Sequence, residues 1–520
     1  MKIRRTLSRP LFLSLLLAAT LGGPTLYPRA ATRIPAAAAA FKPSFVATAC
    51  PFKPGQGLAV GTDLRCGFVV VLEDHNAPTN GRTIKLAVAI FRGRGTVHHT
   101  DPLIFLQGGP GGSIVDSLGP LITRKTYASF VTNRDLVLID QRGTGHSVPN
   151  LNCKELTAIQ FNTLDQNLSL QRQADLQASG ARQCHDRLMR SGVKLNVFTT
   201  LQNAADISDL RTALGYAALN IYGVSYGTRL ALTIMRTQPQ GIRSVVIDSV
   251  LPPSADLVAG PLRTTQRVFK VLFDGCVAST RCNAAYPNLQ STFYRVVAKL
   301  DAHPATIATK DNAGKSYTVL LNGDGFVGLL FSSLYVTPYI SALPAMIFLA
   351  DHGDYRIPSL IYGGLVLDQS VSIGMYYSVE CGEDVPFTSP TAVYAAAQGL
   401  NSVIRPGEVS GQLVEFRICK NWNVSTVAST QKAPVRSNIP TLIFSGEYDP
   451  ITPPADSLLT SKTLPNSTRF VFPGTGHGVY MTNPCPDSIL RTFIDAPTTK
   501  PTGSCIASMT EPAFLTSFGQ

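Results

Sequence analysis

The sequence predicts an α/β fold in which a mostly parallel sheet carries an inserted, mainly helical unit. Short apolar strands alternate with helix-like stretches between residues 103 and 247, and such alternation is typical of a parallel sheet. The alternation stops over residues 253–435. Strands return at residues 441–444 and 469–472, so two halves of one sheet flank the insertion. An insertion placed in this way is expected to form a cap domain.

The elements can be assigned in chain order. The first half contains a hairpin over residues 58–90, strands at 103–106 and 135–139, a helix at 204–214, a strand at 219–222, a helix at 228–236 and a strand at 245–247. The insertion contains long apolar runs, such as 326–334 and 340–349, interrupted by Gly and Pro, which indicates helices. We therefore divide the chain into a signal peptide (1–40), a first core part (41–252), a cap (253–435) and a second core part (436–520).

Composition excludes several classes of protein. The 520 residues are 44% hydrophobic and 15% charged, which is typical of a globular chain rather than a disordered one. The formal net charge is +12, but six basic residues and no acidic ones lie in the first 40 residues. The rest of the chain carries only a mild positive excess. We therefore expect no nucleic-acid partner.

The N-terminus has the pattern of a secretory signal. A basic stretch ends at Arg9, an apolar run covers residues 11–21, and a small-residue tract at 36–40 suits cleavage. The run is shorter than the ~20 apolar residues of a membrane-spanning helix, although a retained anchor is the alternative. We expect a secreted or periplasmic protein with no stable membrane insertion.

Ten cysteines in an exported chain favour disulfides, and no C-x-x-C pair indicates zinc or redox chemistry. Pairing sequence neighbours is the simplest arrangement. It joins Cys50 to Cys66, Cys153 to Cys184, Cys276 to Cys282, Cys381 to Cys419, and Cys485 to Cys505.

Residues 223–227 read G-x-S-x-G, with Ser225 at the centre. A predicted strand precedes this motif and a predicted helix follows it, as a nucleophile elbow requires. Small residues on both sides allow a tight turn that exposes the serine hydroxyl. The alternative is an ordinary glycine-rich turn between a strand and a helix.

A serine nucleophile needs a base, which in turn is oriented by a carboxylate. Asp449 follows the strand at 441–444, and His477 follows the strand at 469–472. Ser, Asp and His in this order, each at the carboxyl end of a strand, is the arrangement of α/β hydrolases. Glu447 is a rival for the acid and ranks lower because it lies closer to the strand.

The oxyanion formed during acyl transfer needs two N–H donors. Tyr226, directly after the serine, is expected to supply the first. The glycine-rich segment 107–113 is expected to supply the second, from Gly109 or otherwise Gly108. The chain contains no H-E-x-x-H and no phosphate-binding loop pattern, so we expect neither a metal nor a cofactor.

Six motifs in one order resemble a known family. They are GGPGGS (108–113), DQRGTGHS (140–147), AADISDLRTALG (204–215), GVSYGTRLA (223–231), GEYDPITP (446–453) and GTGHG (474–478). Together they resemble the secreted tripeptidyl aminopeptidase branch of the prolyl aminopeptidase-like serine peptidases. The resemblance implies an α/β-hydrolase fold with a helical cap, and Ser225, Asp449 and His477 as nucleophile, acid and base. Gln107 replaces the first residue of the H-G-G-P-G pattern of prolyl aminopeptidases, which favours the tripeptidyl branch.

The resemblance also implies that acidic residues of the cap bind the free ammonium group of a peptide substrate. The densest acidic cluster of the cap covers residues 380–384. Within it Glu383 is our first choice and Glu380 our second. The alternative interpretation is a solvated acidic turn.

The leading hypothesis is thus an exported serine exopeptidase that acts on peptides with a free N-terminus and releases one or three residues per cut. The second hypothesis is a carboxylesterase with the same triad and a cap pocket lined by Phe326, Phe331, Tyr335 and Tyr339. The third is a non-catalytic binding protein on a hydrolase fold, against which the intact triad argues.

Overall fold

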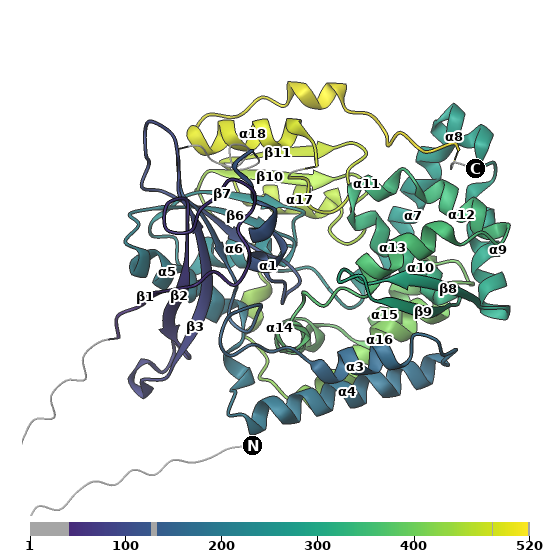
Figure 1. The fold of residues 1–520 in the computed structure, drawn as a ribbon, viewed down its shortest axis with the longest axis horizontal. Coiled ribbons are helices and arrows are strands. Elements are labelled where there is room, and N and C mark those ends of the chain that lie inside the picture. The colour runs from purple at the N-terminus through teal and green to yellow at the C-terminus, as the bar shows by residue number, and fades with distance from the viewer. Residues whose placement is uncertain (1–40, 126–132, 481, 518–520) are drawn as a thin grey trace, which may run out of the picture. The chain divides into compact units, whose positions relative to one another are not determined.

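A nine-stranded sheet forms the centre of the fold (Figure 1). The computed structural model describes residues 41–125, 133–480 and 482–517; the predicted signal peptide over residues 1–40 lies outside them. In spatial order the strands are β1 (Ser44–Thr48), β2 (Leu64–Leu72), β3 (Thr83–Phe91), β5 (Leu136–Ile139), β4 (Leu103–Leu106), β6 (Leu219–Val224), β7 (Ile242–Asp248), β10 (Thr441–Gly446) and β11 (Ser467–Phe472).

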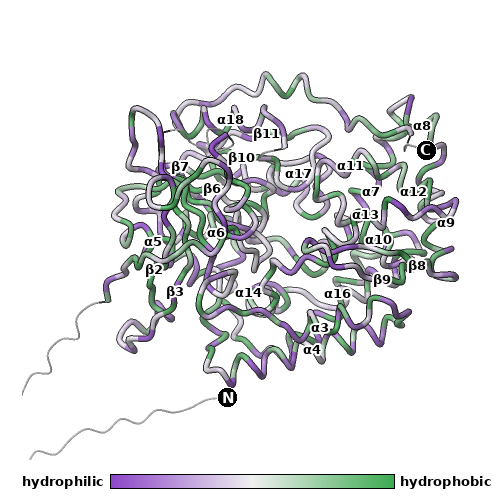
Figure 2. The backbone as a smooth tube through the Cα atoms, viewed as in Figure 1, coloured by the Kyte–Doolittle hydropathy of each residue, from purple (hydrophilic) through white to green (hydrophobic). Residues whose placement is uncertain are grey.

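The six strands from β5 to β11 are parallel, and β1, β2 and β3 extend the sheet through antiparallel pairs. The predicted fold class and the hairpin formed by β2 and β3 are therefore confirmed. The inner strands β4 and β5 are buried along their whole length. Such strands lack polar alternation because helices cover both faces of the sheet. In Figure 2 hydrophobic stretches run through this sheet.

Alternate residues of each inner strand pack on opposite faces of the sheet. Ile104 and Ile221 share a buried cluster with α5 (Thr200–Leu214) and α6 (Tyr226–Thr237). Their neighbours Phe105 and Tyr222 pack with α1 (Ile114–Ser117) and α18 (Pro484–Asp495) on the other face. This two-sided packing fixes the ends of the strands, where the candidate site lies.

The cap lies between β7 and β10 in the chain and has its own buried core. It contains α7 (Gly260–Ala278), α8 (Thr280–Ala285), α9 (Leu289–Ala302), α10 (Gly323–Tyr335), α11 (Thr337–Ile340), α12 (Leu343–Asp351), α13 (Arg356–Val366), α14 (Ile373–Glu383), α15 (Pro390–Ala396) and α16 (Arg405–Trp422). A small antiparallel pair, β8 (Ala305–Lys310) and β9 (Ser316–Leu321), accompanies these helices and was not predicted.

Two helices that precede the cap in the chain also belong to this helical layer. α3 (Lys154–Asn162) and α4 (Leu170–Arg190) fall within the predicted first core part, but they share a buried cluster with α14 and α16 rather than with the sheet. Figure 1 shows them alongside α16. Residues near the C-terminus also reach the cap, where the N–H of Leu515 donates to the carbonyl of Ser341.

The five predicted disulfides are confirmed, and the described residues contain no free cysteine. Cys381–Cys419 joins α14 to α16, and Cys153–Cys184 joins the start of α3 to α4. Such a set fits an oxidising compartment outside the cytosol.

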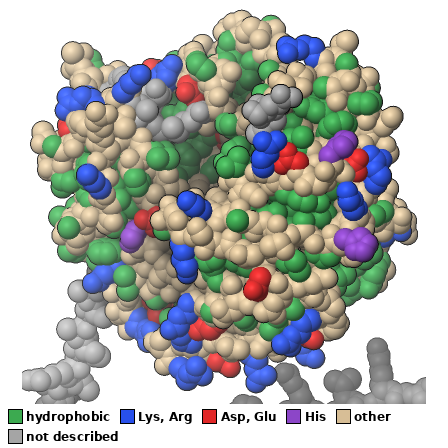
Figure 3. Space-filling model, turned by 45° about the vertical axis from the view of Figure 1, so that its right-hand side comes forward, with side chains coloured by type: hydrophobic (Ala, Val, Ile, Leu, Met, Phe, Trp, Pro, Cys, Tyr) green, Lys and Arg blue, Asp and Glu red, His purple; other side chains and the backbone are tan. Residues whose placement is uncertain are grey.

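Basic and acidic side chains are interspersed on the face shown in Figure 3. No helix within residues 41–125, 133–480 or 482–517 combines the length and apolarity needed to cross a membrane.

Candidate active site

Ser225 lies in a sharp turn between β6 and α6. Its backbone has φ 58° and ψ −125°, a conformation that a non-glycine residue adopts only under strain. Both flanking glycines are required by close backbone contacts. A Cβ at Gly223 would lie 2.4 Å from the carbonyl oxygen of Gly227, and one at Gly227 would lie 2.1 Å from that of Leu106. The G-x-S-x-G motif therefore forms the strand–turn–helix that the sequence predicts.

Asp449 and His477 are brought together by the ends of β10 and β11. Asp449 Oδ2 lies 2.9 Å from His477 Nδ1. Asp449 is fully buried and also accepts bonds from the N–H groups of Ile451 and Thr452 and from the Thr452 hydroxyl. Burial raises the pKa of this carboxyl, but His477 and the Thr452 bonds outweigh burial, so the pKa lies below its usual value.

The same pair controls the protonation of the imidazole. Burial lowers the pKa of His477, and the charge and hydrogen bond of Asp449 raise it by more, so the net shift is upward. Because Nδ1 faces Asp449, Nε2 is the ring nitrogen left for a nucleophile. Among the described residues no hydrogen bond joins Ser225 Oγ to His477. Such bonds are often long in unliganded sites and shorten when substrate binds.

The cap contributes directly to the position of the base. The carbonyl of Tyr335 accepts a hydrogen bond from the N–H of His477, and the two rings meet edge-on at 4.9 Å. The Thr337 hydroxyl accepts from the N–H of Gly476. From α7, Arg267 donates to the carbonyl oxygens of Glu447 and Asp449. The cap therefore holds the backbone of both loops.

The glycine-rich loop after β4 packs against the serine. A Cβ at Gly108 would lie 2.6 Å from the Ser225 Cβ, so only glycine permits this approach. Gly109 is the next residue, with φ 118°. Tyr226 opens α6, where backbone N–H groups have no partner within the helix. Tyr226 and Gly109 remain the predicted oxyanion donors, and Gly108 is the glycine packed on the serine itself.

The motif at residues 140–147 holds the end of the glycine-rich loop through hydrogen bonds. Buried Asp140 accepts bonds from the Ser113 hydroxyl and from the N–H groups of Val115 and His146. Arg142 is fully buried and forms two hydrogen bonds with Asp206 of α5. The 140–147 motif is therefore bonded both to the glycine-rich loop and to α5.

The two predicted amine-binding residues occupy different environments. Glu383 accepts bonds from the N–H and hydroxyl of Thr200, and that hydroxyl lies 2.9 Å from the Tyr226 hydroxyl. Glu380 is fully buried, and neither of its carboxylate oxygens has a hydrogen-bond partner among the described residues. Burial raises the pKa of Glu380, as do the nearby Asp384 and Glu415. Of these two carboxylates, Glu383 is the one that is hydrogen-bonded within the described residues.

Glu415 of α16 joins this acidic cluster, and the sequence analysis missed it. It lies on a different helix, outside the 380–384 segment. Burial raises the pKa of Glu415 to about 7, and its buried Oε2 has no partner within the described chain. The Cys381–Cys419 disulfide, which ties α14 to α16, was the one sequence signal that could have linked Glu415 to Glu380.

Three of the four aromatic residues predicted for an esterase pocket separate into two groups. Tyr335 touches His477, and Phe331 packs against Tyr335 with ring centroids 5.8 Å apart. Phe326 is fully buried in the cap core, where its ring lies 6.2 Å from that of Phe293. The expectation for Phe326 was wrong, because its face of α10 packs inward on α9.

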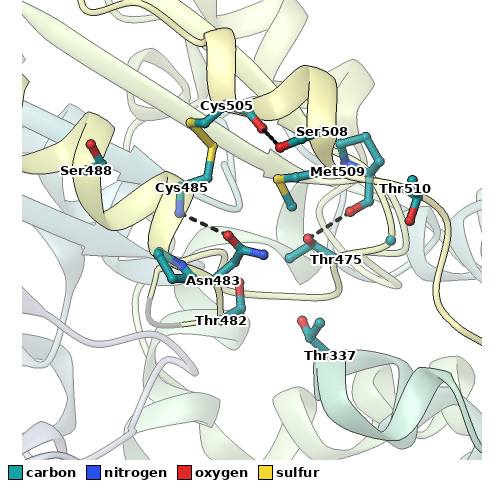
Figure 4. A pocket seen from close by; sticks show the side chains of 13 residues that line it. Thr337, Thr475, Thr482, Asn483, Cys485, Ser488, Cys505, Ser508, Met509 and Thr510 are labelled. Carbon is teal, nitrogen blue, oxygen red and sulfur yellow. Dashed lines mark hydrogen bonds between the residues drawn. A yellow bond between two sulfur atoms is a disulfide. The ribbon is translucent and has the colours of Figure 1, made fainter.

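A cavity of about 530 Å³ lies beyond the His477 loop (Figure 4). Hydroxyl-bearing side chains from the loop, from α11 and from the C-terminal segment line it, together with the Cys485–Cys505 disulfide. They include Thr337, Thr475, Thr482, Ser508 and Thr510. No group of three or more potential metal ligands occurs in the described parts of the chain.

Comparisons with known proteins agree with this geometry. A family model for the α/β-hydrolase fold matches residues 101–273, and a model described as TAP-like protein matches residues 409–505. The chain is 34% identical over 203 residues to a tripeptidyl aminopeptidase of Streptomyces lividans, covering 38% of this chain and 37% of that protein. The match therefore spans just over a third of that relative's length.

Two relatives from Mycobacterium tuberculosis match over most of the chain. Serine protease Hip1 is 24% identical over 475 residues, which covers 84% of this chain and 86% of the relative. Carboxylesterase B is 26% identical over 452 residues, which covers 83% of this chain and 84% of the relative. The relatives thus include both peptidase and esterase names.

Proposed function

The chain is an α/β hydrolase of the TAP-like serine peptidase family, and from this premise we propose that it is an exported aminopeptidase. It would release short N-terminal fragments from peptides through an acyl-enzyme on Ser225. The observation that carries the proposal is Glu380, a buried acid of the cap whose two carboxylate oxygens are unpartnered among the described residues. A buried carboxyl group without a partner is costly unless a ligand completes it.

The acidic cluster lies on a helix that reaches both parts of the candidate site. At the start of α14, the N–H of Ser372 donates to the carbonyl of Gly111 in the glycine-rich loop. At its end, Asp384 binds Arg229, one turn after the serine on α6. Glu380 lies one turn before Asp384 on this helix. An ammonium group bound by Glu380 and Glu415 would therefore lie on the side of the site that binds the N-terminal fragment of the peptide.

The residues support acyl transfer in two steps. Ser225 Oγ attacks the peptide carbonyl while its proton passes to His477 Nε2, and the Asp449 carboxylate stabilises the imidazolium that forms. The N–H of Tyr226 and a glycine N–H of the 107–113 loop would bind the oxyanion. His477 then protonates the leaving amine. A water molecule, deprotonated by the same nitrogen, hydrolyses the acyl-enzyme.

Burial gives the amine-binding carboxyls a further role. With pKa values raised, Glu380 and Glu415 hold protons more readily when the site is empty. A substrate ammonium favours their ionised forms, so binding would release protons. A blocked N-terminus offers no positive charge and gains nothing from these acids. Selectivity for a free N-terminus follows from this difference.

We also propose that the protein is exported. The pattern of residues 1–40 supports a cleaved signal peptide, and the five disulfides support an oxidising destination. N-terminal sequencing of the protein recovered outside the cytoplasm tests it directly. We expect a mature N-terminus close to residue 41, and a retained Met1 would contradict cleavage.

A carboxylesterase is the second candidate, and two observations favour it. One relative carries the name carboxylesterase B, and the aromatic pair Phe331 and Tyr335 lies against the base. The two candidates differ in how they treat a free amine. Peptide amides and esters should be assayed with free and acetylated N-termini, with Ser225→Ala as the inactive control. Amine-dependent amide cleavage supports the aminopeptidase, whereas preference for blocked esters supports the esterase.

A further inference from the structure

A second buried carboxylate, Asp248, lies between the serine and the histidine. It ends β7, the strand between those that carry Ser225 and Asp449. The carbonyl of Asp248 accepts a hydrogen bond from the N–H of Ser225 at 3.0 Å. Its side chain is fully buried, yet it does not contact the predicted acid Asp449 through any hydrogen bond among the described residues.

The Asp248 side chain holds the segment that follows His477. Its Oδ2 accepts bonds from the N–H groups of Val479 and Tyr480, at 2.8 Å and 3.1 Å, and from the Tyr222 hydroxyl. Its Oδ1 accepts from the Ser249 hydroxyl, which in turn accepts from the N–H of Gly478. Three consecutive N–H groups after the base are thus bound by Asp248 and its neighbour.

Two of these donors are backbone N–H groups, which can only donate. Oδ2 therefore accepts from both, and these bonds favour the ionised form of the carboxylate. Burial raises the pKa of Asp248; the bonds from Tyr222, Tyr480 and Val479 and the charge of His477 offset part of that rise, and the net shift is upward. In return, the Asp248 charge contributes to the raised pKa of His477.

We propose that Asp248 is a positioning residue for the reaction, which fixes the His477 loop against the nucleophile turn and electrostatically stabilises the protonated base. One residue bonds both catalytic segments, so it sets the distance over which the proton moves from serine to histidine. This role is separate from that of Asp449, which orients the ring through Nδ1. It rests on the proposed roles of Ser225 and His477 but not on the identity of the substrate.

Several other charged and titratable groups surround His477 and Asp248. His477 faces Asp449 from the β10 loop, Asp248 from β7 and the Tyr335 ring from the cap. Asp248 faces Tyr222 of β6 and Tyr480 of the loop. Asp487 and Arg491 of α18 act electrostatically on Tyr480. Asp449 is the other carboxylate that raises the His477 pKa, and it is unchanged in the variants below.

The test uses the rate at which an organophosphonate labels Ser225, measured across pH, because this rate reports the neutral base without involving a peptide. Asp248→Asn keeps the shape and removes the charge. We expect labelling to slow at least about tenfold at its plateau. We also expect the pH below which labelling falls to move downward, because His477 loses a stabilising negative charge.

Asp135→Asn is the matched control. Asp135 also accepts bonds from a backbone N–H, that of Gly93, and from a tyrosine hydroxyl, that of Tyr216. It lies at the opposite end of the parallel strands, before β5. The Asp135→Asn variant should have lower thermal stability, but the pH dependence of Ser225 labelling should not change. An equal shift in both variants, or none in Asp248→Asn, would overturn the proposal.

Ser249→Ala provides a second route if Asp248→Asn does not fold. It removes the bond to Gly478 and leaves the charge of Asp248 in place. We expect slower labelling with an unmoved pH dependence, and a wild-type rate would overturn the positioning role. An unlabelled wild-type protein would instead overturn the role of Ser225 itself, and this proposal with it.

Discussion

Arg229, one turn after the nucleophile, is bound to Asp384 of the cap by two hydrogen bonds, and both side chains are buried. Lys432 adds a third bond to the same carboxylate at 2.6 Å. A single acid of the cap therefore pairs with two cations, one of them on the helix that begins at the serine. This contact connects the stability of the cap to the geometry of the site.

Removing Asp384 should destabilise the protein strongly. Asp384→Ala leaves Arg229 buried without its closest acidic partner, which costs about 3–5 kcal/mol in the free energy of unfolding. Asp175→Ala is the control, because its pair with Arg417 is solvent-exposed and should contribute far less to stability. Urea unfolding measures both values. Equal losses in the two variants would contradict the importance of the buried pair.

The Cys381–Cys419 disulfide should matter for both stability and substrate binding. It closes a loop with a sequence separation of 38, so losing it should cost about 4 kcal/mol, against about 2 kcal/mol for Cys276–Cys282 with a separation of 6. Because it joins the helices that carry Glu380 and Glu415, its double alanine variant should raise KM for free-amine substrates more than it lowers kcat. The Cys276–Cys282 variant should leave KM unchanged, and a similar rise in KM in both variants would contradict this account.

Glu380→Gln should reduce discrimination between free and blocked N-termini. The amide keeps the shape but loses the charge that pairs with an ammonium, so kcat/KM for free-amine peptides should fall about tenfold or more. Acetylated substrates should be unaffected. Glu383→Gln is the matched comparison, since Thr200 already occupies that carboxylate. Loss of discrimination in Glu383→Gln instead would assign ammonium binding to Glu383.

The same acids predict how binding depends on pH. Glu415, with a pKa raised to about 7, is protonated below that pH and ionised above it. Affinity for free-amine inhibitors should therefore increase as pH rises through about 7, with release of protons. Calorimetry in buffers of different ionisation enthalpy measures that release. Binding that is independent of pH from 6 to 8, a range chosen around that pKa, would count against Glu415 as part of the anchor.

Mutation can show whether Asp449 or Glu447 is the acid of the triad. Activity requires neutral His477 and is lost as pH falls through its pKa, which is raised above 6.5. Asp449→Asn should lower kcat about ten-thousandfold and move this loss to lower pH, because the raising charge is removed. Glu447 instead accepts a bond from the N–H of Gly474, so Glu447→Gln should retain most of the activity. Near-normal turnover of Asp449→Asn would reverse the assignment.

The sequence predicts the sheet and the disulfides well because both depend on short-range patterns. The strand at 103–106 has the predicted limits. Its four apolar residues lie between polar residues and glycines, and such a run is expected to form a strand buried on both faces of the sheet. The β1 strand was missed because Ser44–Thr48 is short and mostly exposed, although Phe45 packs against the core. Its pairing with β2 is a tertiary contact that the local pattern does not encode.

Parts of the candidate site that depend on long-range packing were not predictable. Asp248 was visible as a polar residue at the end of a buried strand, but its bonds run to a loop more than 200 positions away. Glu380 and Glu383 are three residues apart, and only the position of Thr200 distinguishes them. Phe326 and Tyr335 lie on one helix, and only the packing of α9 decides which one turns inward.

During turnover, Ser225 is expected to carry the N-terminal fragment of a peptide as an ester. Rapid acid quenching during turnover of a peptide with a free N-terminus, followed by mass spectrometry of the digested protein, measures this directly. We predict that the segment containing Ser225 gains the mass of an N-terminal acyl fragment, that this mass gives the number of residues released, and that the acetylated peptide yields none. No adduct from free-amine peptides, together with an adduct from a simple ester, would contradict the claim.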